Sequence, residues 1–211
     1  MKALIMVDLQ NDFLPGGALE VRGGDRVIPV INSMQNHFEW VVATRDWHPA
    51  GHGSFASSHP GTLPGEIISL NGLDQILWPD HCVQGNFGAE IAPALDKSRI
   101  NAYIFKGTEP SLDSYSTFYD NAHRRETGLA TFLRDRKIQE LYLCGLATDY
   151  CVKYSALDAL ICGFRVWVIA DATCAVNLEA DDGERSFAEM RDAGAVICTS
   201  HEIRTRPPDN N

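Results

Sequence analysis

The sequence predicts an α/β fold with three layers, in which a mainly parallel sheet is covered by helices on both faces. Six short apolar, β-rich runs recur along the chain, and helix-like stretches lie between several of them. Continuous apolar strands that alternate with helices are typical of such sheets. A chain of 211 residues suffices for one well-buried α/β domain and is short for two. We therefore expect a single domain over 1–211, with a frayed tail after about residue 203.

The expected elements follow one another in order along the chain. The apolar runs predict strands at 2–9 ("KALIMVDL"), 40–46 ("WVVATRD"), 101–105 ("NAYIF"), 140–145 ("ELYLCG"), 165–171 ("RVWVIAD") and 195–200 ("AVICTS"). The helix-like stretches cover 25–38, 126–137, 149–162 and 181–193. No repeat, low-complexity tract or linker divides the chain.

Four of the strands end in a polar or special residue. These residues are Asp8, Asp46, Lys106 directly after Phe105, and Gly145, which leads to Cys151. Ligands of parallel α/β sheets bind in the crevice beyond the carboxyl ends of the strands. Residues far apart in the sequence are therefore expected to meet at one edge of the sheet.

Two connections are longer than the usual few residues. The first covers 47–82 and is rich in Gly, Pro, Ser and His, and the second covers 107–125. Loops of this length in a compact domain tend to be lids or binding loops. Both leave from the same predicted edge, which strengthens the expectation of a site there.

The composition excludes several classes of partner. The chain has 18 basic and 28 acidic residues, a formal net charge of −10, which argues against binding to nucleic acid or to an anionic membrane. The first apolar run is broken by Asp8 after about five residues, too short for a signal peptide. No run approaches the roughly 20 apolar residues of a membrane span. We expect a cytoplasmic protein, a monomer or small homo-oligomer, that acts on a small molecule.

The six cysteines do not predict a disulfide framework in that compartment. No pair has CxxC spacing, which excludes a thioredoxin-type redox site and a paired zinc knuckle. Cys144, Cys162 and Cys198 are expected in the core.

Cys151 differs from the other cysteines in its surroundings. A free cysteine in a helix is usually inert packing. In "GLATDYC", however, Thr148 or Asp149 is expected to cap the helix, which places Cys151 in its first turn. The unpaired N–H groups and the helix dipole favour a thiolate there, and the same N–H groups can hold an oxyanion.

Asp8 and Lys106 are the expected partners of that thiol. A carboxylate inside an apolar run is desolvated and stays charged only beside a cation, for which Lys106 is the natural candidate. The two residues alone can also be read as a salt bridge that holds two strand ends together. With Cys151 at the same edge, they fit a nucleophile that is deprotonated by an acid side chain.

A second cluster lies in "RDWHPAGH" and "WPDHC". Asp46 and His48 are two residues apart, so both side chains point the same way in an extended segment, and His81 can complete an Asp, His, His metal site. Surface histidines in a polar loop are the alternative. His52 is a possible fourth ligand or a group that hydrogen-bonds the ligands.

Three aromatic residues lie in loops at the same edge. Phe13, Trp78 and Tyr115 can form a slot for a flat ring, although each by itself also fits local packing.

Taken in order, the motifs "VDLQNDF", "TRDWHP…HGSF", "WPDHCVQG", "FKG" and "GLATDYCV" resemble those of the isochorismatase-like cysteine hydrolases, and within them the nicotinamide-hydrolysing branch. The resemblance runs from Met1 to about residue 200 and holds at every catalytic and ligand position. It implies a mainly parallel six-stranded sheet flanked by helices.

The resemblance also implies the chemistry of the site. Its triad consists of Asp8, Lys106 and Cys151, its metal ligands are Asp46, His48 and His81, and its oxyanion hole is formed by the N–H groups of Ala147 and Cys151. The Leu146–Ala147 peptide is expected to be cis. Phe13, Trp78 and Tyr115 hold the ring, and one divalent transition metal, zinc in the first place and otherwise iron or manganese, orients it.

The reaction implied is hydrolysis of nicotinamide, and of pyrazinamide, to the acid and ammonia through a cysteine thioester, as part of NAD salvage. Three other readings compete with it. Amidases of this superfamily that act on N-carbamoyl or ureido compounds share the triad but need not carry the Asp46, His48, His81 set. Isochorismatases proper use no cysteine at position 151, and a silent metal-binding or interaction module has no need of Cys151.

Overall fold

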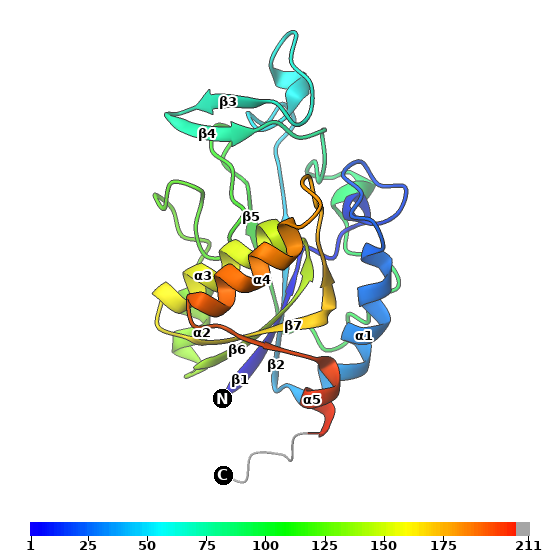
Figure 1. Ribbon diagram of the computed structural model, residues 1–211, viewed down its shortest axis with the longest axis vertical. Coiled ribbons are helices and arrows are strands. Elements are labelled where there is room, and N and C mark those ends of the chain that lie inside the picture. Colours follow the sequence, from blue (N-terminus) through cyan, green and yellow to red (C-terminus); the bar gives the residue numbers. More distant parts are fainter. Residues whose placement is uncertain (206–211) are drawn as a thin grey trace.

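A six-stranded, fully parallel sheet forms the middle layer of the computed structural model, with the strand order β5-β2-β1-β6-β7-β8 (Figure 1). The structure describes residues 1–205. The strands are β1 (Lys2–Val7), β2 (Trp40–Asp46), β5 (Ala102–Lys106), β6 (Glu140–Leu146), β7 (Arg165–Cys174) and β8 (Val196–Cys198). All six strands predicted from the apolar runs are confirmed, with ends shifted by a few residues.

The central strand β1 explains why its sequence is continuously apolar. In the register, Leu4 lies between Val41 of β2 and Tyr142 of β6. Alternate residues point to opposite faces, so Leu4 and Met6 belong to one core cluster while Ile5 belongs to the other. A strand that is buried on both faces has no polar side.

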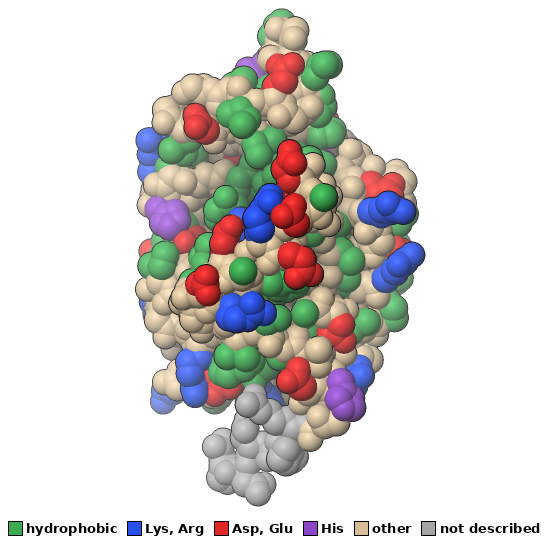
Figure 2. Space-filling model, viewed as in Figure 1, with side chains coloured by type: hydrophobic (Ala, Val, Ile, Leu, Met, Phe, Trp, Pro, Cys, Tyr) green, Lys and Arg blue, Asp and Glu red, His purple; other side chains and the backbone are tan. Residues whose placement is uncertain are grey.

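Helices cover both faces, as predicted. One core cluster contains residues of α1 (Val27–Met34) and α5 (Ser200–Thr205). The other contains residues of α2 (Leu129–Asp135), α3 (Lys153–Ile161) and α4 (Asp182–Asp192). In the space-filling view, Asp and Glu side chains gather over α4 on the solvent side, in keeping with the acidic composition (Figure 2).

The structure adds a two-stranded hairpin and a helix that the sequence analysis missed. The long loop 47–82 contains an antiparallel hairpin of β3 (Ile67–Leu70) and β4 (Leu73–Ile76). Its turn is Asn71-Gly72, both with positive φ, and this dipeptide is a strong hairpin signal. The last predicted strand ends at Cys198, and α5 begins at Ser200. Of the predicted frayed tail, Arg204 and Thr205 belong to α5, and 206–211 lie outside the described residues.

The topology brings the chemistry-bearing residues to one edge of the sheet. Because β5, β2, β1 and β6 are neighbours and parallel, their carboxyl ends lie side by side. The β3–β4 hairpin lies beyond this edge, at the end of the molecule away from the N-terminus (Figure 1). The longest helix in residues 1–205, α4, has 11 residues, and no helix in that range is long and apolar enough to cross a bilayer.

Candidate active site

Cys151 lies in the tight turn between β6 and α3. The Leu146–Ala147 peptide is cis, as expected, and a π-helical turn over Thr148–Val152 leads into α3. The cysteine is 7% exposed and lines a cavity. All six cysteines are free, which confirms that the chain has no disulfide framework, and Cys162 is half-buried where the sequence predicted core.

The predicted helix cap is wrong. No side chain caps this turn. The Thr148 hydroxyl instead hydrogen-bonds that of Thr173 at 2.8 Å, and Asp149 accepts the backbone N–H groups of Val176 at 2.9 Å and Asn177 at 2.8 Å. Asp149 thus ties the turn that carries Cys151 to the loop after β7, because a buried carboxylate needs donors that only a distant segment supplies.

Lys106 joins the ends of three strands. Its ammonium lies 2.9 Å from an Asp8 oxygen and 3.0 Å from an Asp46 oxygen, and it donates to the Ser114 carbonyl at 2.9 Å. These three oxygens match the three N–H bonds of an ammonium group. Its nitrogen also lies 3.4 Å from the sulfur of Cys151. The structure therefore brings Asp8, Lys106 and Cys151 into mutual contact.

Burial governs protonation in this group. Burial raises the pKa of Asp8, and the Lys106 charge offsets only part of this. Burial likewise raises the pKa of the Cys151 thiol well above its usual range, again against the effect of Lys106. The pKa of Lys106 is itself raised well above normal, since Asp46 and Asp8 outweigh the desolvation of its charge. These shifts favour a thiol at Cys151 and a charged Lys106, whereas the sequence predicted that the start of the helix favours a thiolate.

Asp46, His48 and His81 converge as predicted. One ligand atom of each lies within 4.8 Å of the others. His48 donates Nδ1–H to the Gly107 carbonyl at 2.9 Å, and His81 donates Nδ1–H to the Pro79 carbonyl at 2.8 Å. In the neutral imidazole the second nitrogen, Nε2, then carries a lone pair. Both Nε2 atoms face the same Asp46 oxygen, at 3.0 and 3.3 Å.

This donor set fits a divalent transition metal. Two lone pairs that face a carboxylate oxygen in a dry site repel it unless a proton or a metal cation lies between them. Asp113 adds a buried carboxylate 4.0 Å from His48 Nε2, and Lys106 is the one buried Lys or Arg side chain among residues 1–205. Two nitrogens and a carboxylate oxygen are ligands that zinc, iron and manganese accept.

His52 does not face this set. It is fully buried beside His48, with ring centroids 4.3 Å apart, but its nitrogens contact Ser54 and the Glu109 carbonyl. His52, His48 and Asp113 also lie close to one another, but both ring nitrogens of His52 already have hydrogen-bond partners.

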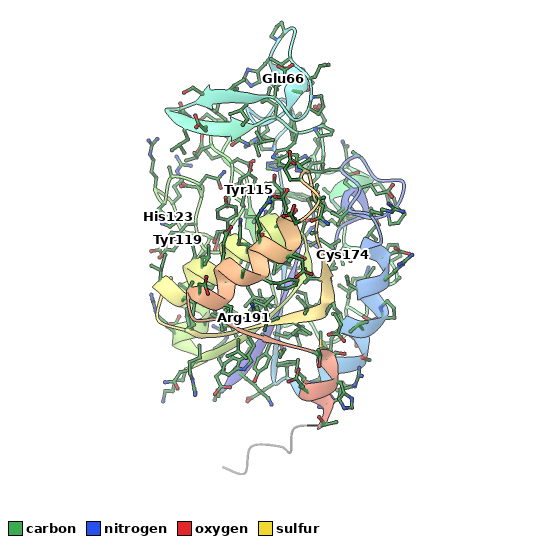
Figure 3. All side chains as sticks on the ribbon, viewed as in Figure 1. Glu66, Tyr115, Tyr119, His123, Cys174 and Arg191 are labelled. Atoms are coloured by element: carbon green, nitrogen blue, oxygen red, sulfur yellow. The ribbon has the colours of Figure 1, made fainter. Side chains whose placement is uncertain are left out.

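A cavity of ≈ 410 Å³, including its mouth, opens in front of Cys151. Phe13, Trp78 and Tyr115 all line it, so the structure brings the predicted aromatic residues together. The Tyr115 hydroxyl accepts a hydrogen bond from Trp78 Nε1 at 3.2 Å. In Figure 3, Tyr115 lies between the β3–β4 hairpin and the helices α3 and α4.

The sequence analysis missed part of the cavity wall. The further lining residues are Leu19, Val21, Asp113, Tyr150 and Val176. Tyr150 adjoins Cys151 in the sequence, and its ring contacts Trp78 and Tyr115 at centroid distances of 5.0 and 5.4 Å. Its position next to Cys151 was the sequence signal by which Tyr150 could have been predicted to line the cavity. The three aliphatic residues come from loops without a motif, and no local pattern marks them.

Comparison with known proteins agrees with this geometry. The isochorismatase domain model matches residues 2–202. The chain belongs to the isochorismatase family. This confirms the family resemblance and the fold expected from it, and it makes the protein a hydrolase of the isochorismatase-like type.

Among the relatives of this isochorismatase-family chain are nicotinamidases. The chain is 50% identical to the nicotinamidase of Escherichia coli over 202 residues, covering 94% of each chain. It is 43% identical to that of Acinetobacter baylyi over 201 residues, covering 95% of this chain and 94% of the other.

Solved structures match the isochorismatase-family fold over nearly the whole chain. A nicotinamidase/pyrazinamidase of Acinetobacter baumanii has a TM-score of 0.93 at 43% identity, covering 96% and 97% of the two chains. A protein of L. infantum, solved with nicotinate, has a TM-score of 0.83 at 39% identity, covering 95% and 93%. A pyrazinamidase of Pyrococcus horikoshii, solved with zinc, has a TM-score of 0.76 at 39% identity, covering 94% and 98%.

Proposed function

We propose that the protein hydrolyses nicotinamide to nicotinate and ammonia, and accepts pyrazinamide, with Cys151 as the nucleophile. The observation that carries the proposal is the contact of Asp8, Lys106 and Cys151 at the base of an aromatic cavity. The nicotinamidases that are 43–50% identical to this chain, and the nicotinate complex of the L. infantum protein, support this choice of substrate.

Phe13, Trp78 and Tyr115 bind the pyridine ring between their faces and edges, which excludes water from the reacting carboxamide. Asp46, His48 and His81 would hold a divalent metal, which would supply a Lewis acid toward the pyridine nitrogen. We propose zinc, in line with the zinc complex of the P. horikoshii pyrazinamidase, with iron or manganese as the alternatives.

Asp8 is the proton carrier of the mechanism. It lies beside Lys106, which contacts the Cys151 sulfur, and its raised pKa makes it a stronger base than an ordinary carboxylate. As Asp8 takes the thiol proton, the sulfur attacks the amide carbon. Lys106 stays charged and stabilises the negative charge on the sulfur in the transition state.

The oxyanion is held by the backbone N–H groups of Ala147 and Cys151, each worth about 3 kcal/mol in comparable sites. Protonated Asp8 then gives its proton to the nitrogen, the carbon–nitrogen bond breaks, and ammonia leaves a thioester on Cys151. Asp8, again a carboxylate, deprotonates a water molecule that attacks the thioester. The carbon–sulfur bond breaks, the proton returns to sulfur, and nicotinate is released.

The test is direct. Purified protein is mixed with nicotinamide, and ammonia and nicotinate are measured for the wild type, for Cys151→Ala and for Cys162→Ala. Cys162 is a half-buried cysteine just after α3 and does not line the cavity, which makes it the matched control. We expect Cys151→Ala to lose about 10⁴-fold or more in kcat and Cys162→Ala to keep it. Robust release by Cys151→Ala, or turnover of an N-carbamoyl compound in place of nicotinamide, would contradict the proposal.

We propose further that one domain, spanning 1–211, carries this activity as a monomer or small homo-oligomer, and that the product feeds NAD salvage. The six free cysteines fit a reducing compartment, and on that ground we place the protein in the cytoplasm.

A further inference from the structure

We infer that His52 is a positioning residue and not a fourth metal ligand: it docks the loop 107–115, here called the Glu109 loop, onto the segment that carries Asp46 and His48. Only the expected change in KM for nicotinamide rests on the proposed function. The bonding of the ring and the placement of the loop are independent of the substrate.

The ring nitrogens of His52 are both occupied. Nε2 lies 2.7 Å from the Glu109 carbonyl oxygen, which can only accept, so Nε2 carries the hydrogen. In the neutral ring Nδ1 is then the acceptor, and the Ser54 backbone N–H donates to it at 3.2 Å, with the Ser54 hydroxyl at 2.8 Å. This tautomer leaves no lone pair for a metal.

The metal-binding histidines have the opposite arrangement. His48 and His81 each donate Nδ1–H to a backbone carbonyl and turn Nε2, the ligating nitrogen of a neutral ring, toward Asp46. A carbonyl partner on one nitrogen is what orients a ligand imidazole, because it fixes which nitrogen stays free. In His52, the carbonyl partner and the N–H donor together use both nitrogens.

The contact of His52 with Glu109 is one of two consecutive bonds between the segments. The next residue, Gly53, donates its N–H to the Pro110 carbonyl at 2.7 Å. The segments approach so closely there that a Cβ on Gly53 would lie 3.2 Å from the same oxygen. His52 itself is fully buried, and Glu109 at the other end of this bond is half-buried.

The Glu109 loop carries two groups of the proposed mechanism. Ser114 offers its carbonyl to Lys106 at 2.9 Å, and Tyr115 forms a wall of the aromatic cavity. Asn121 holds the far end of the loop, since its side chain accepts the Tyr115 N–H at 2.9 Å. His52 holds the near end. Loss of the His52 bond is therefore expected to make Tyr115 more mobile in the cavity wall. Through Ser114, it is also expected to make the position of Lys106 less fixed.

Two substitutions separate the functions of the two nitrogens. The amide nitrogen of Gln reaches the position of Nε2, so His52→Gln can still donate to the Glu109 carbonyl. Asn reaches only the position of Nδ1, so His52→Asn keeps an acceptor for Ser54 and loses Glu109. Neither side chain offers an imidazole ligand to a metal.

The experiment uses full-length protein loaded with zinc. We expect about one zinc per chain in the wild type and in both variants, because His52 ligates nothing. For His52→Asn we expect KM for nicotinamide to rise about tenfold, as for one lost buried hydrogen bond, with a smaller change in kcat. Amide hydrogen exchange in 107–115 is expected to become faster in His52→Asn, and His52→Gln is expected to restore both properties close to wild type.

A fall in zinc content in both variants would overturn the inference, since it would make His52 a ligand. Equal effects of His52→Gln and His52→Asn on amide hydrogen exchange and on KM would show that His52 only fills space, and would contradict its role in docking the Glu109 loop. Zinc content and exchange need no turnover, so a failure of nicotinamide hydrolysis would leave this test intact. If either variant does not fold, ¹⁵N NMR of the histidine side chains in the zinc-loaded wild type tests the inference. We expect His52 Nε2 to be protonated and free of metal, and a zinc-bound His52 nitrogen would refute the inference.

Discussion

Replacing Lys106 with methionine tests the electrostatic core of the site. Met has nearly the volume of Lys and no charge, so the change leaves the Asp8 and Asp46 carboxylates without the ammonium that lies 2.9 and 3.0 Å away. The side chains of Lys106 and Asp8 are fully buried, so no solvent screens the loss. Removing one partner of a buried ion pair costs about 3–5 kcal/mol of unfolding free energy. Asp8 can reduce this cost by taking up a proton, and it then ceases to be a base.

The double variant Asp8→Asn/Lys106→Met isolates the pair. Lys106→Met leaves the Asp8 carboxylate without its counter-ion, and Asp8→Asn does the reverse, whereas the double variant removes both of these charges and leaves only Asp46 without the ammonium. We therefore expect it to recover about 1–3 kcal/mol relative to the sum of the singles. Urea unfolding at equal zinc occupancy measures this coupling. In the ammonia-release assay, all three variants are expected to lose kcat by about 10³-fold or more, because the base and its counter-ion act as a unit. Additive unfolding free energies, or substantial kcat in Lys106→Met, would refute the reasoning.

Three further predictions concern the metal site and the cavity. Gly107→Ala is expected to lose most of its bound metal, because a Cβ there would lie 2.5 Å from a ring carbon of His48. Gly128→Ala is the control: Gly128 also has a positive φ, but a Cβ there would have nothing within 4 Å, so this variant has only the backbone strain. Metal analysis of the two variants compares their metal content. Tyr115→Phe removes the hydroxyl that accepts from Trp78, and we expect KM to rise about 3–10-fold with kcat nearly kept. Removing the metal with a chelator is expected to raise KM at least about tenfold and to be reversed by zinc; activity that is indifferent to chelation would contradict the proposed ligand set.

The fold was predictable because its sheet is parallel and buried on both faces. Such strands must be apolar without interruption, and β2 was predicted at its observed ends, Trp40–Asp46. The same patterns placed Asp8 and Lys106 at strand ends, and a parallel sheet brings such ends together in any compact packing. The convergence of the proposed triad and of the three proposed metal ligands was therefore predictable from the sequence, and the family resemblance supplied the roles that we propose for them.

The sequence predicted less well where tertiary contacts override local signals. The expected cap at Thr148 or Asp149 is absent because Thr173 and the backbone at Val176 and Asn177 engage those side chains. The thiolate expected for Cys151 is disfavoured because burial outweighs the start of the helix.

His52 is a residue whose role depends on the tertiary structure and not on the local sequence. Its spacing from His48 marks it as a possible ligand, and the composition of the segment can say no more. The chemistry of an imidazole depends on which nitrogen holds the hydrogen, and a partner decides that. For His52 the deciding partner is the Glu109 carbonyl, 57 residues away in the sequence, and only the folded chain brings the two together. The sequence alone determined which side chains reach the sheet edge; the tertiary structure decided which of their atoms remain free to react.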